Sequence, residues 1–93
     1  MLIRVVYSER ARRSLLEIGL FIAGRNPDAA LRLVTGIQQR LNDVLTVFPE
    51  AGPRVGDGKR FMTVRHHTVL YRFDAAKGEV VVLDVFGPGM DWR

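Results

Sequence analysis

Two adjacent histidines, His66 and His67, are the residues of this chain best suited to proton transfer, because an imidazole titrates close to neutral pH. Neighbours on an extended chain point to opposite faces, so the two rings cannot reach one metal ion or one substrate atom together. The sequence also has no cluster of Asp, Glu and His residues with the spacing of metal ligands. We therefore expect no metal site and no cofactor. A histidine in a β-turn is interpreted as a solvated turn residue, with a general acid or base as the functional alternative.

Three arginines, Arg60, Arg65 and Arg72, fall on neighbouring strand-like runs, where their side chains can converge on one anionic surface. Arginine suits bidentate contact with phosphate or carboxylate, and twelve of the fourteen basic residues are arginine. With ten acidic residues the formal net charge is +4, which favours an anionic partner. The alternative interpretation is a solvated basic surface that protects the sheet edges against aggregation.

The sequence gives less support for a phosphate-binding loop, a hydrolase triad or cysteine chemistry. Gly56-Asp57-Gly58-Lys59 looks like a phosphate-binding loop, but a strand follows it instead of the Ser or Thr and the helix N-terminus that such a loop requires. Ser8 and Ser14 have no histidine nearby in sequence and no nucleophile-elbow glycines, so a hydrolase triad is not supported. The absence of cysteine excludes disulfides and a thiolate nucleophile. Trp92, the only tryptophan, is a candidate anchor for a partner or else packs back on the sheet.

The N-terminal half, which must help to position these residues, is predicted to form a strand and two helices. Residues 2–7 are rich in β-branched and aromatic side chains and predict a strand, and Ser8 is placed to cap a helix that runs to about Gly24. Asn26-Pro27-Asp28 predicts the start of a second helix, because Asn caps a helix and proline has no amide to leave unpaired at the first position. The apolar spacing of this helix continues until Pro49. The short link between the helices implies a helical hairpin.

The C-terminal half is predicted to form a sheet. Three strand-like runs, 60–65, 68–73 and 79–86, follow a connection rich in glycine and proline. The short links between these runs imply antiparallel pairing. The chain therefore predicts an α+β fold of two layers, in which an N-terminal strand and an α-helical hairpin pack with a mainly antiparallel sheet of about four strands, in the order β-α-α-β-β-β. Its 93 residues make one domain, 1–93.

The first helix is apolar on two sides. One stripe has helical spacing and is predicted to face the core: Ala11, Leu15, Ile18 and Ile22. A second set lies far round the helix from this stripe: Leu16, Leu20 and Ala23. Either the sheet and the second helix bury one side each, which we favour, or the second set forms an exposed patch that awaits a partner.

The composition is that of an ordinary soluble globular domain, with 47% hydrophobic and 26% charged residues. No apolar run approaches the roughly 18 residues that cross a bilayer, and the N-terminus lacks the pattern of a secretory signal. We therefore expect a cytoplasmic protein without a membrane partner.

A series of short segments runs along nearly the whole chain in a family-specific order: Tyr7-Ser8-Glu9-Arg10-Ala11, Ile22-Ala23, Asn26-Pro27-Asp28-Ala29-Ala30, Phe48-Pro49-Glu50-Ala51-Gly52, Val69-Leu70-Tyr71-Arg72 and Asp91-Trp92. Their order and spacing resemble the ParE/RelE superfamily of bacterial type II toxins, and the ParE branch more than the RelE branch. The resemblance implies a toxin that inhibits DNA gyrase by binding and has no catalytic centre of its own. It also implies a hetero-oligomer with a cognate, ParD-like antitoxin whose C-terminal segment wraps the helical hairpin and the sheet.

The resemblance assigns expected contact residues on two surfaces. The expected antitoxin contacts are Arg12, Leu16, Leu20 and Leu31. The expected target contacts are Arg60, Arg65, Arg72, Trp92 and Arg93.

Two alternatives stay open within the resemblance. One is a RelE-like, ribosome-dependent mRNA endonuclease that binds nucleic acid directly through Arg65, His66 or His67, and Arg72. The other is a relative that has lost toxicity and only binds the antitoxin. The sequence departs from the superfamily pattern at Thr68, where RelE-like members have an arginine, and in the tail at Gly87-Pro88-Gly89, where both branches usually have a basic residue.

Overall fold

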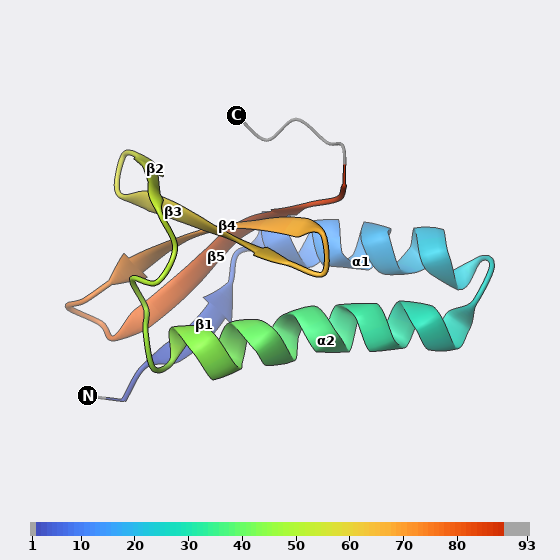
Figure 1. Cartoon of the computed structure of the whole chain (residues 1–93), viewed down its shortest axis with the longest axis horizontal. Helices are drawn as coiled ribbons and strands as arrows, with labels where there is room; N and C mark the ends of the chain where they lie inside the picture. Colours follow the sequence, from blue (N-terminus) through green and yellow to red (C-terminus); the bar gives the residue numbers. More distant parts are fainter. Residues whose placement is uncertain (1, 89–93) are drawn as a thin grey trace.

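Two antiparallel helices pack on one face of a five-stranded sheet in the computed structural model, which describes residues 2–88 (Figure 1). The elements follow one another as β1 (Arg4–Tyr7), α1 (Glu9–Ala23), α2 (Pro27–Leu45), β2 (Arg54–Gly56), β3 (Lys59–Val64), β4 (His67–Asp74) and β5 (Glu79–Phe86). This arrangement confirms the predicted two-layer α+β fold, with its N-terminal strand and its helical hairpin.

The sheet has the order β1-β5-β4-β3-β2. β1 pairs in parallel with β5, and the other neighbours are antiparallel, as predicted for a mainly antiparallel sheet. β2 is a fifth strand within the segment that was predicted to be a loop, so the expectation of about four strands was one short. It pairs Arg54 with Arg60 and Gly56 with Lys59 across an irregular register. The glycines and proline that suggested a loop remain compatible with pairing because β2 is a short edge strand.

Both helices begin at the residues that the sequence predicts. The Ser8 hydroxyl accepts a hydrogen bond from the amide of Ala11 at 3.0 Å and donates one to the carbonyl of Leu83 in β5 at 2.9 Å. The Asn26 side chain accepts from the amide of Ala29 at 3.0 Å, and Pro27 occupies the first helical position. Each cap satisfies an amide that would otherwise lack a partner, and the Ser8 hydroxyl also ties the start of α1 to the sheet.

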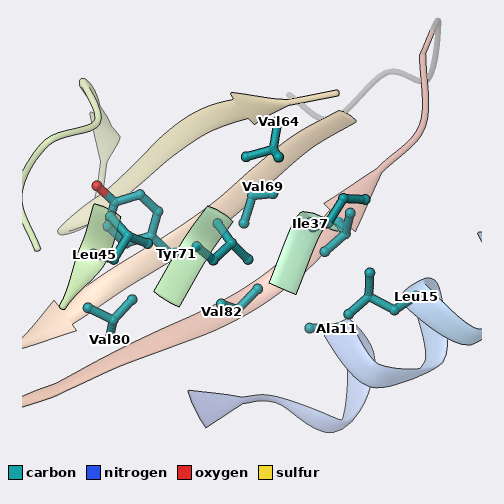
Figure 2. Close-up of a cluster of buried hydrophobic side chains, with 11 residues drawn as sticks. Ala11, Leu15, Ile37, Leu45, Val64, Val69, Tyr71, Val80 and Val82 are labelled. Atoms are coloured by element: carbon teal, nitrogen blue, oxygen red, sulfur yellow. The ribbon is translucent and has the colours of Figure 1, made fainter. Parts of the chain in front are cut away.

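The hydrophobic core lies between the helices and the sheet (Figure 2). Its largest fully buried side chains are Tyr71, Ile37, Leu41, Leu45, Val69, Val80, Val82 and Val85. Along β4, residues on the helix side are buried, whereas Arg72 on the opposite side is exposed. The alternation predicted for this strand therefore holds, and one face of the sheet is left without a helical layer.

The expectation that both apolar sides of α1 are buried is wrong. The buried residues of α1 are Ala11 and Leu15, both in its first half, whereas the side chains of Leu16 and Leu20 are 60% and 62% exposed. In Figure 1 the connected ends of the two helices extend past the sheet, so the sheet covers the second half of α1 only in part. α2 lies beside α1 and covers only part of its remaining surface.

Burial of the two tyrosines predicts a loss of stability at high pH. Burial raises the pKa of both Tyr7 and Tyr71 above the usual value of about 10. The resulting stabilisation is complete below pH 10, where the unfolded chain also keeps both hydroxyl protons, and it is lost as the pH rises through the folded-state values. We expect the tyrosinate absorbance of the folded chain to appear at higher pH than that of the chain in denaturant, which should appear near pH 10. Coincident titrations under the two conditions would contradict this prediction.

Candidate functional site

An apolar groove of about 560 Å³ runs between α1 and α2. It is lined by Tyr7, Arg12, Leu15, Leu16, Gly19, Leu20, Ala23, Ala30, Leu31, Val34 and Gln38. The four residues that the family resemblance assigned to antitoxin contacts come from two different helices, and all of them lie in this lining. Leu31 is 68% exposed, and with Leu16 and Leu20 it presents three large apolar side chains to solvent. A contiguous exposed apolar surface of this kind marks an interaction site more often than a free surface.

Small residues let the two helices approach closely beneath the groove. A side chain on Gly19 would bring its Cβ within 3.3 Å of the Val34 side chain, which is tighter than an ordinary contact. Ala23 and Ala30 add little bulk to the lining. The groove is therefore lined by small residues and by leucines, with Arg12 among its lining residues. This shape and composition suit the apolar face of an amphipathic helix that also carries an acidic residue.

The three strand arginines do not converge on one surface. Arg60 pairs with the buried Tyr71 across the β3–β4 ladder, whereas Arg72 pairs with Lys59, one residue along, on the opposite face of the sheet. Arg65 lies at the turn between β3 and β4, against α2. The sequence placed Arg60 and Arg72 on neighbouring strands correctly, but Arg65, predicted at the end of a strand, lies in the turn. The faces depend on the register, and a shift of one residue reverses them.

Arg60 is held by the loop that follows α2. Its guanidinium donates hydrogen bonds to the backbone carbonyls of Glu50 at 3.2 Å and Gly52 at 2.8 Å, and it forms a 3.0 Å ion pair with the Glu50 carboxylate. Only 14% of the Arg60 side chain is exposed. Its donors are therefore largely occupied within the chain, which suits a residue that fixes the loop better than one that reaches a partner.

The two histidines occupy different environments. His66 is exposed in a two-residue turn, as predicted, but His67 is buried in β4, so its interpretation as a solvated turn residue is wrong. The Nδ1 atom of His67 lies 2.8 Å from the carbonyl oxygen of Arg65. Because a carbonyl only accepts, this contact requires a proton on Nδ1. The register of the hairpin, which a single sequence does not reveal, turns this ring toward the helices.

The side chains proposed for RNA cleavage do not form a cluster. His67 faces the helices, Arg72 lies on the opposite face of the sheet, and Arg65 and His66 lie at the turn. Metal-free RNA cleavage needs a base, an acid and a cation around one phosphate, and these residues do not meet that requirement.

A second hollow, of about 460 Å³, was not anticipated from the sequence. It lies between α1 and the end of β5 and includes Ser14, Phe21 and His67 in its lining. The Ser14 hydroxyl donates to the Asp84 carboxylate at 2.6 Å, and that carboxylate also accepts from the amide of Val85. In a hydrolase triad the histidine stands between the serine and the carboxylate, so this direct contact is not the arrangement of a nucleophilic site.

Trp92 and Arg93, two of the expected target contacts, lie outside the described residues. Within residues 2–88, no group of three or more His, Cys, Asp or Glu side chains is placed to hold a metal ion. Over the same residues, neither helix has the length and apolar character that a membrane crossing requires.

Comparisons with known proteins identify the family of the chain from its sequence and find solved structures with a similar fold. Residues 5–92 match the family model of the ParE toxin of the type II toxin-antitoxin system parDE. The chain is similar to the chromosomal ParDE system from P. aeruginosa, with 17% identity, a TM-score of 0.78, and coverage of 94% of this chain and 97% of that chain. It is also similar to the RelBE2 toxin-antitoxin complex from Mycobacterium tuberculosis, with 22% identity, a TM-score of 0.61, and coverage of 94% and 99%. For the intact E. coli RelBE complex the identity is 16%, the TM-score 0.63 and the coverage 97% and 100%. None of the curated proteins matches the sequence.

Proposed function

The chain belongs to the ParE toxin family of type II toxin-antitoxin systems, and from this premise we propose that it inhibits DNA gyrase and is neutralised by a ParD-like antitoxin bound between α1 and α2. The observation that carries the antitoxin part is the exposed apolar groove. The similar structures from P. aeruginosa, M. tuberculosis and E. coli are toxin-antitoxin systems or complexes, which supports a partner of this kind.

The energetics of the groove support a bound partner. Full burial of a leucine side chain contributes about 1.5–3 kcal/mol, and Leu16, Leu20 and Leu31 are all largely exposed in the free chain. An amphipathic helix that covers all three would therefore gain a large apolar contribution to its binding free energy. Arg12 would select an acidic residue at the edge of that helix, because a guanidinium pairs well with a carboxylate.

Inhibition by binding suits the residues better than catalysis does. The side chains suggested for RNA cleavage lie on different surfaces, and an inhibitor that acts by contact needs no such cluster. We propose that Arg72 and Arg65 contact gyrase, together with Trp92 and Arg93 from outside the described residues. Arg60 would contribute indirectly, since its guanidinium holds the loop beside β3.

Induction of the toxin without an antitoxin tests the proposal. We expect growth arrest, loss of supercoiling by purified gyrase in the presence of the purified chain, and intact cellular mRNA. Cleaved mRNA with normal supercoiling would replace the proposal with the endonuclease alternative. Normal growth at high expression would indicate a relative that has lost toxicity.

A further inference from the structure

The turn between β3 and β4 has an unfavourable backbone conformation. Val64 pairs with His67, so only Arg65 and His66 form the loop, and both have positive φ angles of 49° and 67°. Two-residue hairpin turns of this type favour Asn and Gly, because other side chains rarely adopt the left-handed region. The hydrogen bond between the buried His67 ring and the Arg65 carbonyl holds this conformation in place. Backbone strain of this kind occurs often at functional positions.

The guanidinium of Arg65 lies on α2 at a glycine. A Cβ atom on Gly36 would lie 2.6 Å from the guanidinium carbon and 2.8 Å from two of its nitrogens. Glycine inside a helix is unfavourable relative to alanine. The contact therefore involves an unfavourable conformation in the turn and an unfavourable residue in α2. The strained turn and the helical glycine together allow the Arg65 guanidinium to lie close against the surface of α2.

Two further arginines flank this guanidinium. A hollow of about 520 Å³ has Arg32 and Arg65 in its lining, and a neighbouring hollow of about 370 Å³ has Arg40 and Arg65. Arg4, Arg13 and Arg60 each form an ion pair with a glutamate. By contrast, the guanidinium groups of the three arginines on this surface make no hydrogen bond or ion pair with any residue from 2 to 88.

We propose that Arg32, Arg40 and Arg65 form a carboxylate-binding site over Gly36, and that this site receives acidic side chains of the antitoxin. The inference rests on the proposed function, because it extends the antitoxin path beyond the groove between the helices. Leu31 lines both that groove and the hollow that contains Arg32 and Arg65. A peptide that leaves the groove across Leu31 therefore reaches the three arginines directly.

An acidic peptide fits the site better than nucleic acid does. Arg32 and Arg40 are eight residues apart, which is about 12 Å along a helix, the length of a short peptide segment. Asp43 lines the hollow beside Arg40, where the Gln39 amide holds its carboxylate at 2.8 Å. This carboxylate repels an anion of either kind, but it can pair with a basic residue, which a peptide can carry and a phosphate backbone cannot. An apolar groove at one end of the site is also a poor surface for DNA or RNA.

Titration of the full chain with blocked hexaglutamate, followed by NMR of the Arg65 Nε–Hε group and the Gly36 amide, tests the site. We expect salt-sensitive shifts of both signals, and affinity about tenfold weaker in Arg65→Ala and in Gly36→Ala. Arg10→Ala is the matched control, since it removes the same charge from an exposed position on α1 and should bind as the parent chain does. Equal affinity in all four proteins would overturn the proposal. A twelve-base-pair DNA duplex that binds at Arg65 more tightly than hexaglutamate would overturn it in favour of a nucleic-acid site.

Gly36→Ala separates a positioning role from a general effect on the fold. Alanine favours the helix, and the atoms that it meets belong to the end of a flexible side chain, so we expect the melting temperature to stay equal or rise while hexaglutamate affinity falls. A fall in both would indicate damage to the fold and would overturn the positioning role.

The outcome is independent of the gyrase assay. If the chain leaves gyrase active but binds hexaglutamate at Arg65, only the proposed inhibition of gyrase is contradicted. Hexaglutamate that shifts no signal at Arg65 or Gly36 would overturn the carboxylate site and leave the gyrase result standing.

Discussion

Substitution of both Leu16 and Leu20 by glutamate is expected to abolish neutralisation by the antitoxin without unfolding the chain. Both side chains are mostly exposed in the free protein, so charges at these positions remain in water and the fold loses little. In the complex the substitution removes two buried leucines, which contribute about 1.5–3 kcal/mol each, and leaves two carboxylates in an apolar groove. A loss of about 3–6 kcal/mol corresponds to roughly 10²–10⁴-fold in Kd.

Binding of the antitoxin from the same operon, measured by calorimetry, and growth on co-expression give two readouts of this prediction. We expect the double variant to bind at least a hundredfold more weakly and to arrest growth even when the antitoxin is present. Phe21→Glu is the matched control, because Phe21 is 82% exposed on the same helix but lines the other hollow, near the end of β5. Normal binding of the antitoxin to the double variant would show that the antitoxin covers a different surface. An equal loss of affinity in Phe21→Glu would show the same.

The two helices could be predicted from local patterns in the sequence, whereas the exposure of the second apolar side of α1 could not. Ser8 and Asn26 identify the two helix starts because each cap acts on an amide three residues away. The second apolar side of α1 follows from spacing on one helix, and it correctly marks Leu16 and Leu20 as unusual. Whether α2 covers them depends on how the two helices pack against each other, and the spacing of residues on one helix does not contain this information.

The faces of the strand residues could not be predicted because they depend on register. Arg60 and Arg72 seemed to share a surface, but the pairing of Arg60 with Tyr71 places them on opposite faces. For His67 the same register decides between a solvated turn and the core. Contact between Arg65 and Gly36 joins residues that are far apart in the sequence, so no local pattern predicts it.

Substitution of Gly52 by alanine is expected to be among the most destabilising single changes in the chain. The Gly52 amide donates a 2.8 Å hydrogen bond to the buried hydroxyl of Tyr71. An added Cβ would overlap the carbonyl oxygen of Phe61 and lie 2.9 Å from that hydroxyl, so the loop would have to move away from β3. The shift also disturbs the hydrogen bonds from Arg60 to this loop. Overpacking together with a lost buried hydrogen bond costs about 3 kcal/mol or more, out of a total stability of roughly 5–15 kcal/mol.

Thermal unfolding of three variants shows how much of the stability loss in Gly52→Ala comes from steric overlap and how much from the lost hydrogen bond. For a domain of this size, 3 kcal/mol corresponds to a fall in Tm of roughly 12–24 °C for Gly52→Ala. Tyr71→Phe removes only the acceptor and leaves the amide unpaired, so we expect an intermediate loss of about 1–3 kcal/mol. Gly24→Ala is the matched control, because its Cβ would meet only carbonyl oxygens at 3.9 Å and 4.0 Å, and it should leave Tm unchanged or slightly raised. If Gly52→Ala melted like Gly24→Ala, the loop would be free to move off the sheet, and Arg60 would then be available to a partner after all.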